Sequence, residues 1–84
     1  MPTVATVAGV VIRLYYADHE PAHVHAVAGE DEMLVAIADG RVIAGDLPGP
    51  QRRAVLAWAA EHRAELALAW VRCRTGVKPG RVGG

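Results

Sequence analysis

The chain has 84 residues, of which 52% are hydrophobic and 21% charged, and its nine basic and nine acidic residues give a net charge of zero. A chain of this length forms one hydrophobic core and has no room for a second domain, and its apolar content excludes an intrinsically disordered protein. The single cysteine, Cys73, cannot pair within the chain, which suits a reducing compartment and predicts a cytoplasmic protein. The longest early apolar stretch, residues 4–12, is too short to span a bilayer, so we expect neither a signal peptide nor a transmembrane helix.

The zero net charge hides an uneven distribution along the chain. Residues 1–48 contain seven acidic and two basic residues, whereas residues 49–84 contain seven basic and two acidic residues. A basic rear half suits a negatively charged partner such as a nucleic acid. Attraction between the two halves within one fold explains the same distribution, so the charges alone leave both interpretations open.

β-branched and aromatic residues predict short strands throughout the front half. The segments concerned are residues 3–9, 10–17, 23–28, 32–38 and 41–46. Gly9, the Gly-Glu-Asp sequence at 29–31 and the Asp39–Gly40 pair separate some of them, and each is typical of a tight turn. In the second segment the even-numbered residues are the more apolar and should face the core. Tight turns between successive strands predict an antiparallel meander of four to five strands.

The rear half is predicted to be helical. Pro50 suits a first helical turn, and neither Gly nor Pro interrupts residues 51–73. Apolar positions recur at three- and four-residue steps, but in one continuous helix Leu56 and Trp70 would share a face with arginines. A break near residues 61–65 would resolve this conflict, so one long helix and two short ones both stay open, with two favoured.

These elements predict an α+β fold in a single domain over residues 1–75, followed by a Gly-rich flexible tail over residues 76–84. The helical residues should pack on one face of the sheet. Trp58, Leu66 and Trp70 should be largely buried against it.

Three of the four histidines lie in one stretch, Asp-His-Glu-Pro-Ala-His-Val-His, at residues 18–25. His23 and His25 are two residues apart, so on a strand they project from the same face and can bind one metal ion together. His19 or Asp18 from the preceding turn could complete the site. Nitrogen-rich ligation of this kind suits zinc, nickel or iron and leaves a position open for water.

Two other interpretations of this stretch remain. The histidines could act as acids and bases without a metal, which would make His19, His23 and His25 the catalytic candidates. They could also be structural, each bonded separately to the backbone, with Asp18 capping the turn. Four arginines of the rear half are candidates for phosphate or nucleic-acid contacts, although helix arginines more often form a solvated face. They are Arg52, Arg53, Arg63 and Arg74.

The sequence resembles the small prokaryotic proteins catalogued as domain of unknown function 4160. The resemblance rests on the Met-Pro-Thr start, on the histidine stretch and on Ala-Glu-Leu-Ala-Leu-Ala-Trp at residues 64–70. The family's stretch reads Asp-His-x-Pro-Pro-His-Val-His, and Ala22 here replaces the second proline. The matching positions are Asp18, His19, Pro21, His23 and His25.

The resemblance implies a role rather than an activity. Members are often encoded beside a second small protein, in an arrangement that resembles a toxin–antitoxin pair. We therefore expect a small bacterial protein that forms half of a two-protein module, with a neighbouring gene product as its partner and self-association as a further option. The alternative is a small metal-assisted or histidine-dependent hydrolase or nuclease that acts on a phosphate-containing substrate.

Overall fold

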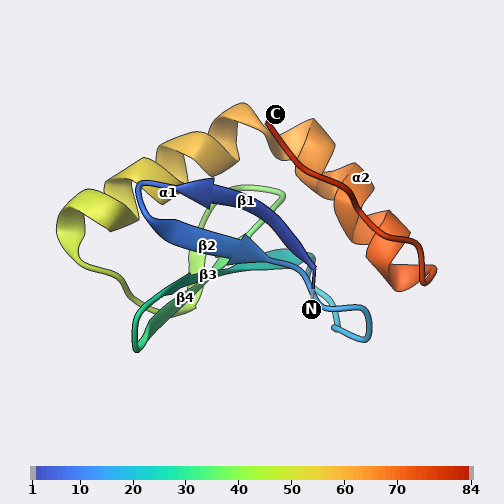
Figure 1. Ribbon diagram of the computed structural model, residues 1–84, viewed down its shortest axis with the longest axis horizontal. Coiled ribbons are helices and arrows are strands. Elements are labelled where there is room, and N and C mark those ends of the chain that lie inside the picture. The colour runs from blue at the N-terminus through green and yellow to red at the C-terminus, as the bar shows by residue number, and fades with distance from the viewer. Residues whose placement is uncertain (1, 84) are drawn as a thin grey trace.

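The computed structural model describes residues 2–83 and confirms the α+β fold. Five strands form one antiparallel sheet in the order β1-β2-β3-β4-β5, and two helices follow (Figure 1). The elements are β1 (Thr3–Val7), β2 (Val10–Arg13), β3 (His23–Ala28), β4 (Asp31–Ala36), β5 (Val42–Gly45), α1 (Gly49–Glu61) and α2 (Arg63–Arg74). The sheet is therefore the predicted meander, with the larger of the two expected strand numbers.

Two-residue turns set the register of the β1–β2 hairpin and of the β3–β4 hairpin. Val7 pairs with Val10 across a turn in which both Ala8 and Gly9 have positive φ angles, 51° and 78°. Hairpins favour such turns because their twist matches that of the strands, although a left-handed alanine is unusual. Ala28 pairs with Asp31 across a turn that begins at Gly29, with φ 59°. Each turn lies where the sequence predicted one.

The sequence misjudged the length of two elements. β2 ends at Arg13 rather than at residue 17, because the chain leaves the sheet to form a loop over residues 14–22. The turn predicted at Asp39–Gly40 spans residues 37–40, closed by hydrogen bonds from the Ala36 N–H to the Arg41 carbonyl (2.9 Å) and from the Gly40 N–H to the Ala36 carbonyl (2.9 Å).

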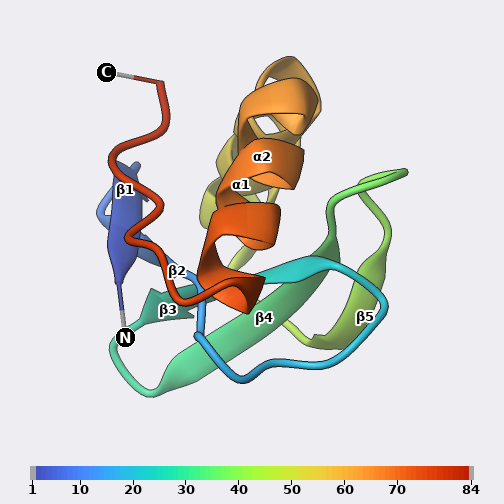
Figure 2. The same ribbon diagram turned by 90° about the vertical axis from the view of Figure 1, so that its right-hand side faces the viewer.

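Both helices lie over the same face of the sheet (Figures 1 and 2). Their buried side chains join those of the strands in one core, and the fully buried members include Ile12, Leu14 and Leu66. The prediction that the even-numbered β2 residues face inward is thus confirmed for the strand itself, whereas Tyr16 beyond it is 40% exposed. The core sits between the sheet and the helices and leaves the opposite sheet face uncovered by helix.

The helical region is two helices, and His62 is the residue between them. Its backbone leaves helical geometry (φ −121°, ψ 25°), and its ring Nδ1 donates to the Trp58 carbonyl at 2.8 Å, which satisfies a carbonyl left free at the end of α1. The ring also stacks on Trp58, with centroids 5.0 Å apart. Trp58 is only partly buried, contrary to expectation, whereas Trp70 is 5% exposed as expected.

The segment after α2 was predicted to be a flexible tail, and residues 77–83 of it return along β1 (Figure 2). The Val82 N–H donates to the Val4 carbonyl at 2.8 Å, and the Val82 side chain is buried. The Gly83 N–H donates to Glu65 at 3.1 Å. The first contact pairs the returning segment with β1 at Val4, and the second ties it to α2. Within residues 2–83, neither helix has the length and apolar character needed to cross a membrane.

Candidate metal centre

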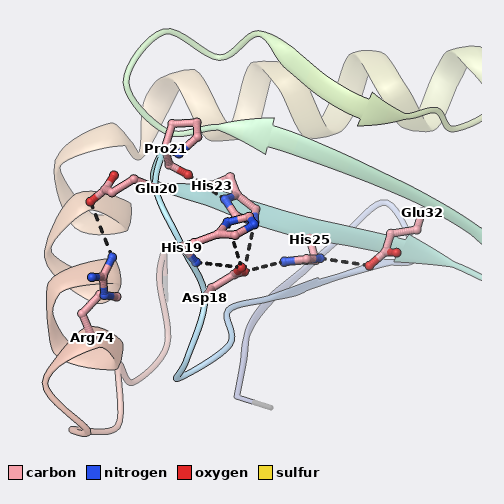
Figure 3. Close-up of polar contacts among 8 residues, drawn as sticks. All are labelled: Asp18, His19, Glu20, Pro21, His23, His25, Glu32 and Arg74. Carbon is pink, nitrogen blue, oxygen red and sulfur yellow. Dashed lines mark hydrogen bonds and ion pairs between the residues drawn. The ribbon is translucent and has the colours of Figure 1, made fainter.

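Asp18, His23 and His25 converge at the end of the sheet where the loop 14–22 meets β3 (Figure 3). The Asp18 Oδ2 atom lies 3.0 Å from His23 Nε2 and 2.8 Å from His25 Nε2. One ligand atom from each of the three side chains lies within 4.8 Å of the others, and together they could hold a metal ion. The two-residue spacing on β3 turns both imidazoles toward one point, and the loop brings the carboxylate to meet them.

The outer nitrogen of each ring is held by a separate acceptor. His23 Nδ1 donates to the Pro21 carbonyl at 2.7 Å, and His25 Nδ1 lies 3.0 Å from Glu32 Oε2. Metal-binding histidines usually hold their outer nitrogen in this way, because the bond fixes the ring orientation and leaves the inner nitrogen as the ligand atom. Here both Nε2 atoms are the inner ones.

The protonation of the rings decides between two descriptions of the cluster. A carbonyl only accepts hydrogen bonds, so His23 Nδ1 carries a proton. If its Nε2 also donates to Asp18, His23 is a doubly protonated cation, and the same holds for His25 between Asp18 and Glu32. If a divalent cation sits between the three side chains, both rings are neutral and all their nitrogens are satisfied. The same geometry thus describes either two imidazolium ions around one carboxylate or three ligands around one metal.

Asp18 is ionised in either description. Burial acts to raise its pKa, but hydrogen bonds from His25 and from the His19 backbone N–H, with the charges of His23 and His25, outweigh this effect and lower the pKa below its usual value. An ionised carboxylate is the form that binds metals.

Aromatic rings enclose the two histidines. His23 is 2% exposed and lies against Trp70 of α2, with ring centroids 5.5 Å apart. The Tyr15 ring meets His25 edge-on at 4.3 Å. The side chains of Asp18 and His25 are 15% and 14% exposed, so the site opens to solvent on their side. This partial enclosure strengthens electrostatic attraction at the site while it leaves a route for a ligand.

The structure leaves His19 outside the cluster. Its side chain is 87% exposed and its Nδ1 lies 3.8 Å from Asp18 Oδ1. Only its backbone N–H contributes, by donating to Asp18 at 3.1 Å. The sequence had offered His19 and Asp18 as alternatives for the third ligand, and the loop turns Asp18 inward and His19 outward.

The sequence analysis missed Glu32, which β4 places beside His25. The turn predicted at residues 29–31 would have placed Glu32 on the other sheet face, whereas the observed two-residue turn at 29–30 pairs Val27 with Glu32 and so places Glu32 diagonal to His25 on the same face. Trp70 was predicted from the sequence as a buried packing residue, and neither spacing nor periodicity indicated the contacts of Tyr15 and Trp70 with the histidines.

The four candidate arginines do not converge on one surface site. Arg52 lies 3.0 Å from Asp46, and Arg74 lies 3.7 Å from Glu20 and over the Trp70 ring at 5.8 Å. Arg63 reaches the Asp39 carbonyl at 3.5 Å, and Arg53 is exposed on α1. The ion pairs of Arg52 and Arg74 each join the acidic front half to the basic rear half. They are the attraction between the two halves that was one of the two interpretations of the charge distribution.

The fold and the cluster define a small α+β protein with two histidines and one carboxylate grouped at the end of an antiparallel sheet. The chain belongs to the family described as Domain of unknown function (DUF4160), which it matches over residues 9–71, a span that contains the whole cluster and Glu32. No curated protein and no solved structure matches the chain.

Proposed function

We propose that the protein binds one divalent transition metal through Nε2 of His23, Nε2 of His25 and a carboxylate oxygen of Asp18. The proposal rests on how each imidazole ring is held. Its Nδ1 atom bonds to an acceptor outside the cluster, and its Nε2 atom points at the position that the three side chains share. Metal–nitrogen bonds of 2.0–2.1 Å place neighbouring ligand atoms about 3.0 Å apart in an octahedral site and about 3.4 Å apart in a tetrahedral one. The nitrogen–oxygen distances of 2.8 and 3.0 Å are close to the octahedral value and shorter than the tetrahedral one.

Two imidazoles and one carboxylate suit zinc, nickel or iron, since imidazole binds all three and the carboxylate offsets half of the charge of a divalent ion. Three protein ligands leave at least one coordination position for water or another ligand. Asp18 and His25 are the more exposed of the three side chains, so a ligand from solvent would approach a bound metal on their side.

Metal content of untagged protein tests the proposal. The protein should bind about one equivalent of zinc or nickel with a rise in melting temperature, because a ligand that binds only the folded state stabilises it. Asp18→Ala and His25→Ala should each abolish stoichiometric binding, whereas His19→Ala is the matched control and should leave it unchanged. Less than a tenth of an equivalent of any transition metal, with no thermal shift on adding zinc or nickel, would refute the proposal.

For the biological role, we infer that the protein is a bacterial cytoplasmic half of a two-protein, toxin–antitoxin-like module. The resemblance stated above supports this role, and the unpaired, buried Cys73 suits a reducing compartment. The partner would be a small protein encoded by a neighbouring gene. β5 offers it an edge, because its residues from Ile43 to Gly45 are exposed while β1 is covered by residues 77–83. Co-purification of the neighbouring gene product with the tagged chain tests this, and a second copy of this chain on β5 would appear as a dimer instead.

The alternative is a metal-assisted hydrolase or nuclease, with Asp18, His23 and His25 holding the metal and the basic residues attracting phosphate. The open coordination position favours it, since a catalytic metal needs one for water or substrate. Among residues 2–83, Glu32 is the one further carboxylate that bonds to a member of the cluster, and its bond to His25 occupies it. Expression of the chain alone discriminates the two roles: an active toxin arrests growth and His23→Ala relieves the arrest, whereas an antitoxin or binding half leaves growth unaffected.

A further inference from the structure

A second hollow lies where residues 2–3, the loop 14–22 and the returning segment 77–83 meet. It is a cavity of about 330 Å³. Its lining residues are Pro2, Thr3, Tyr16, Lys78, Pro79, Gly80 and Arg81. None of the proposed metal ligands belongs to it. The volume is within the range of cavities that hold small organic ligands.

The charged groups of this cavity are all positive. Lys78 and Arg81 line it from either side of the Pro79–Gly80 pair, and no acidic residue is among the lining residues. No ion pair joins either cation to a carboxylate anywhere within residues 2–83, whereas Arg41, Arg52 and Arg74 each have one. Two cations that share a concave surface without a counter-charge attract an anion.

Most of the other lining residues have apolar rings. Pro2, Pro79 and the Tyr16 ring line the cavity, and Tyr16 is 40% exposed although most large apolar side chains are buried. An aromatic face next to proline rings suits a planar group of a ligand. The Thr3 and Tyr16 hydroxyls add hydrogen-bonding groups at the same surface.

The backbone that carries the two cations is fixed in place. Pro79 is buried and its carbonyl accepts from Arg72 Nη1 at 3.3 Å. The Val82 N–H donates to Val4, and Gly80 has a φ of 75° that favours glycine, which turns the chain between the two cations. Lys78 and Arg81 are therefore presented on a fixed turn, which reduces the ordering cost of binding.

We propose that this cavity binds a small organic anion, a planar or aromatic body that carries a phosphate or carboxylate group. Lys78 and Arg81 would hold the anionic group, and Tyr16 would stack on the planar body. Phosphate groups also occur in nucleic acids, so the test must separate a small molecule from a polynucleotide. The proposal does not depend on the metal centre.

The test is an NMR titration of the ¹⁵N-labelled full chain with phenyl phosphate, inorganic phosphate, benzyl alcohol and a single-stranded oligonucleotide. Phenyl phosphate should bind with a Kd below about 1 mM and shift the amide signals of Thr3, Tyr16 and Gly80. Inorganic phosphate should bind at least about fivefold more weakly, because it lacks the planar body, and benzyl alcohol should not bind. Binding should weaken as salt is added.

Variants assign the binding to the cavity. Lys78→Gln and Arg81→Gln, both at exposed positions, should each weaken phenyl phosphate at least about fivefold, whereas Arg53→Gln removes the same charge from α1 and should have no effect. His25→Ala should bind phenyl phosphate normally, and loss of binding there would assign the anion to the metal centre and overturn the proposal. Equal losses in Arg53→Gln, tighter binding of the oligonucleotide than of phenyl phosphate, or no shifts at all would each overturn it as well.

Discussion

Replacing Glu32 by Ala provides the sharpest test of how the metal centre is built. Glu32 is no ligand in the proposed site, but its Oε2 atom lies 3.0 Å from His25 Nδ1 and fixes the direction in which Nε2 points. In Glu32→Ala the ring loses its outer acceptor and some of its basicity. We expect the metal to bind more weakly while the three ligands stay present.

The size of the expected loss in metal affinity follows from the solvent exposure of the His25–Glu32 pair. Loss of an outer hydrogen-bond partner of a metal-binding histidine typically costs between about tenfold and about 100-fold in metal affinity. The His25 side chain is 14% exposed but that of Glu32 is 46% exposed, so water can partly replace the lost carboxylate. We therefore expect a loss near the lower limit, about tenfold, which corresponds to about 1.4 kcal/mol. Glu32→Gln keeps an acceptor and should lose less.

The assay is a competition titration of zinc or nickel against a fluorescent chelator, with Glu30→Ala as the matched control. Glu30 lies in the turn of the same hairpin and is exposed, so its replacement removes the same charge without the contact to His25. An equal loss in Glu30→Ala and Glu32→Ala would mean that only net charge matters. An unchanged affinity in Glu32→Ala, in a chain where Asp18→Ala abolishes binding, would refute the orienting role of Glu32.

Three further predictions concern stability and reactivity. Ala8→Asn should raise the free energy of unfolding by about 1 kcal/mol, because Ala8 has a φ of 51° and Asn adopts this conformation more readily. Denaturant unfolding measures this free energy. The control is Ala38→Asn, at a turn position without a positive φ, which should give no gain. Leu66→Ala should lower the same free energy by about 3 kcal/mol, since Leu66 is a fully buried residue of α2, and a loss below about 1 kcal/mol would show that the helix is not packed as described. Cys73 should react with thiol reagents far more slowly in the folded than in the unfolded chain, because burial shields it and raises its pKa. Because the pKa of Cys73 is raised in the folded state, its contribution to stability is complete at neutral pH and is lost as the pH rises above about 8.5, where the unfolded thiol ionises. The free energy of unfolding of Cys73→Ala should therefore fall less steeply with rising alkaline pH than that of the unchanged chain.

The strands and helices could be predicted because their signals are local. Gly9, Gly29 and the alternation within residues 10–14 fix turns and facing within a few residues of one another, and the structure confirms each. The conflict between Trp70 and the arginines indicated a helix break, which occurs at His62. The predicted C-terminal end of β2 and the predicted length of the turn 37–40 were wrong, because both depend on the later path of the chain, which no local pattern specifies.

The sequence by itself determined that His23 and His25 share one direction, since strand geometry turns every second side chain to the same side. Only the tertiary structure decided that Asp18 rather than His19 joins them, that Glu32 holds the outer nitrogen of His25, and that residues 77–83 return to β1. These outcomes depend on the path of the loop 14–22, on the register between β3 and β4, and on packing against β1. Each brings together groups that lie from five to nearly eighty residues apart, and their closeness arises only when the whole core closes around them.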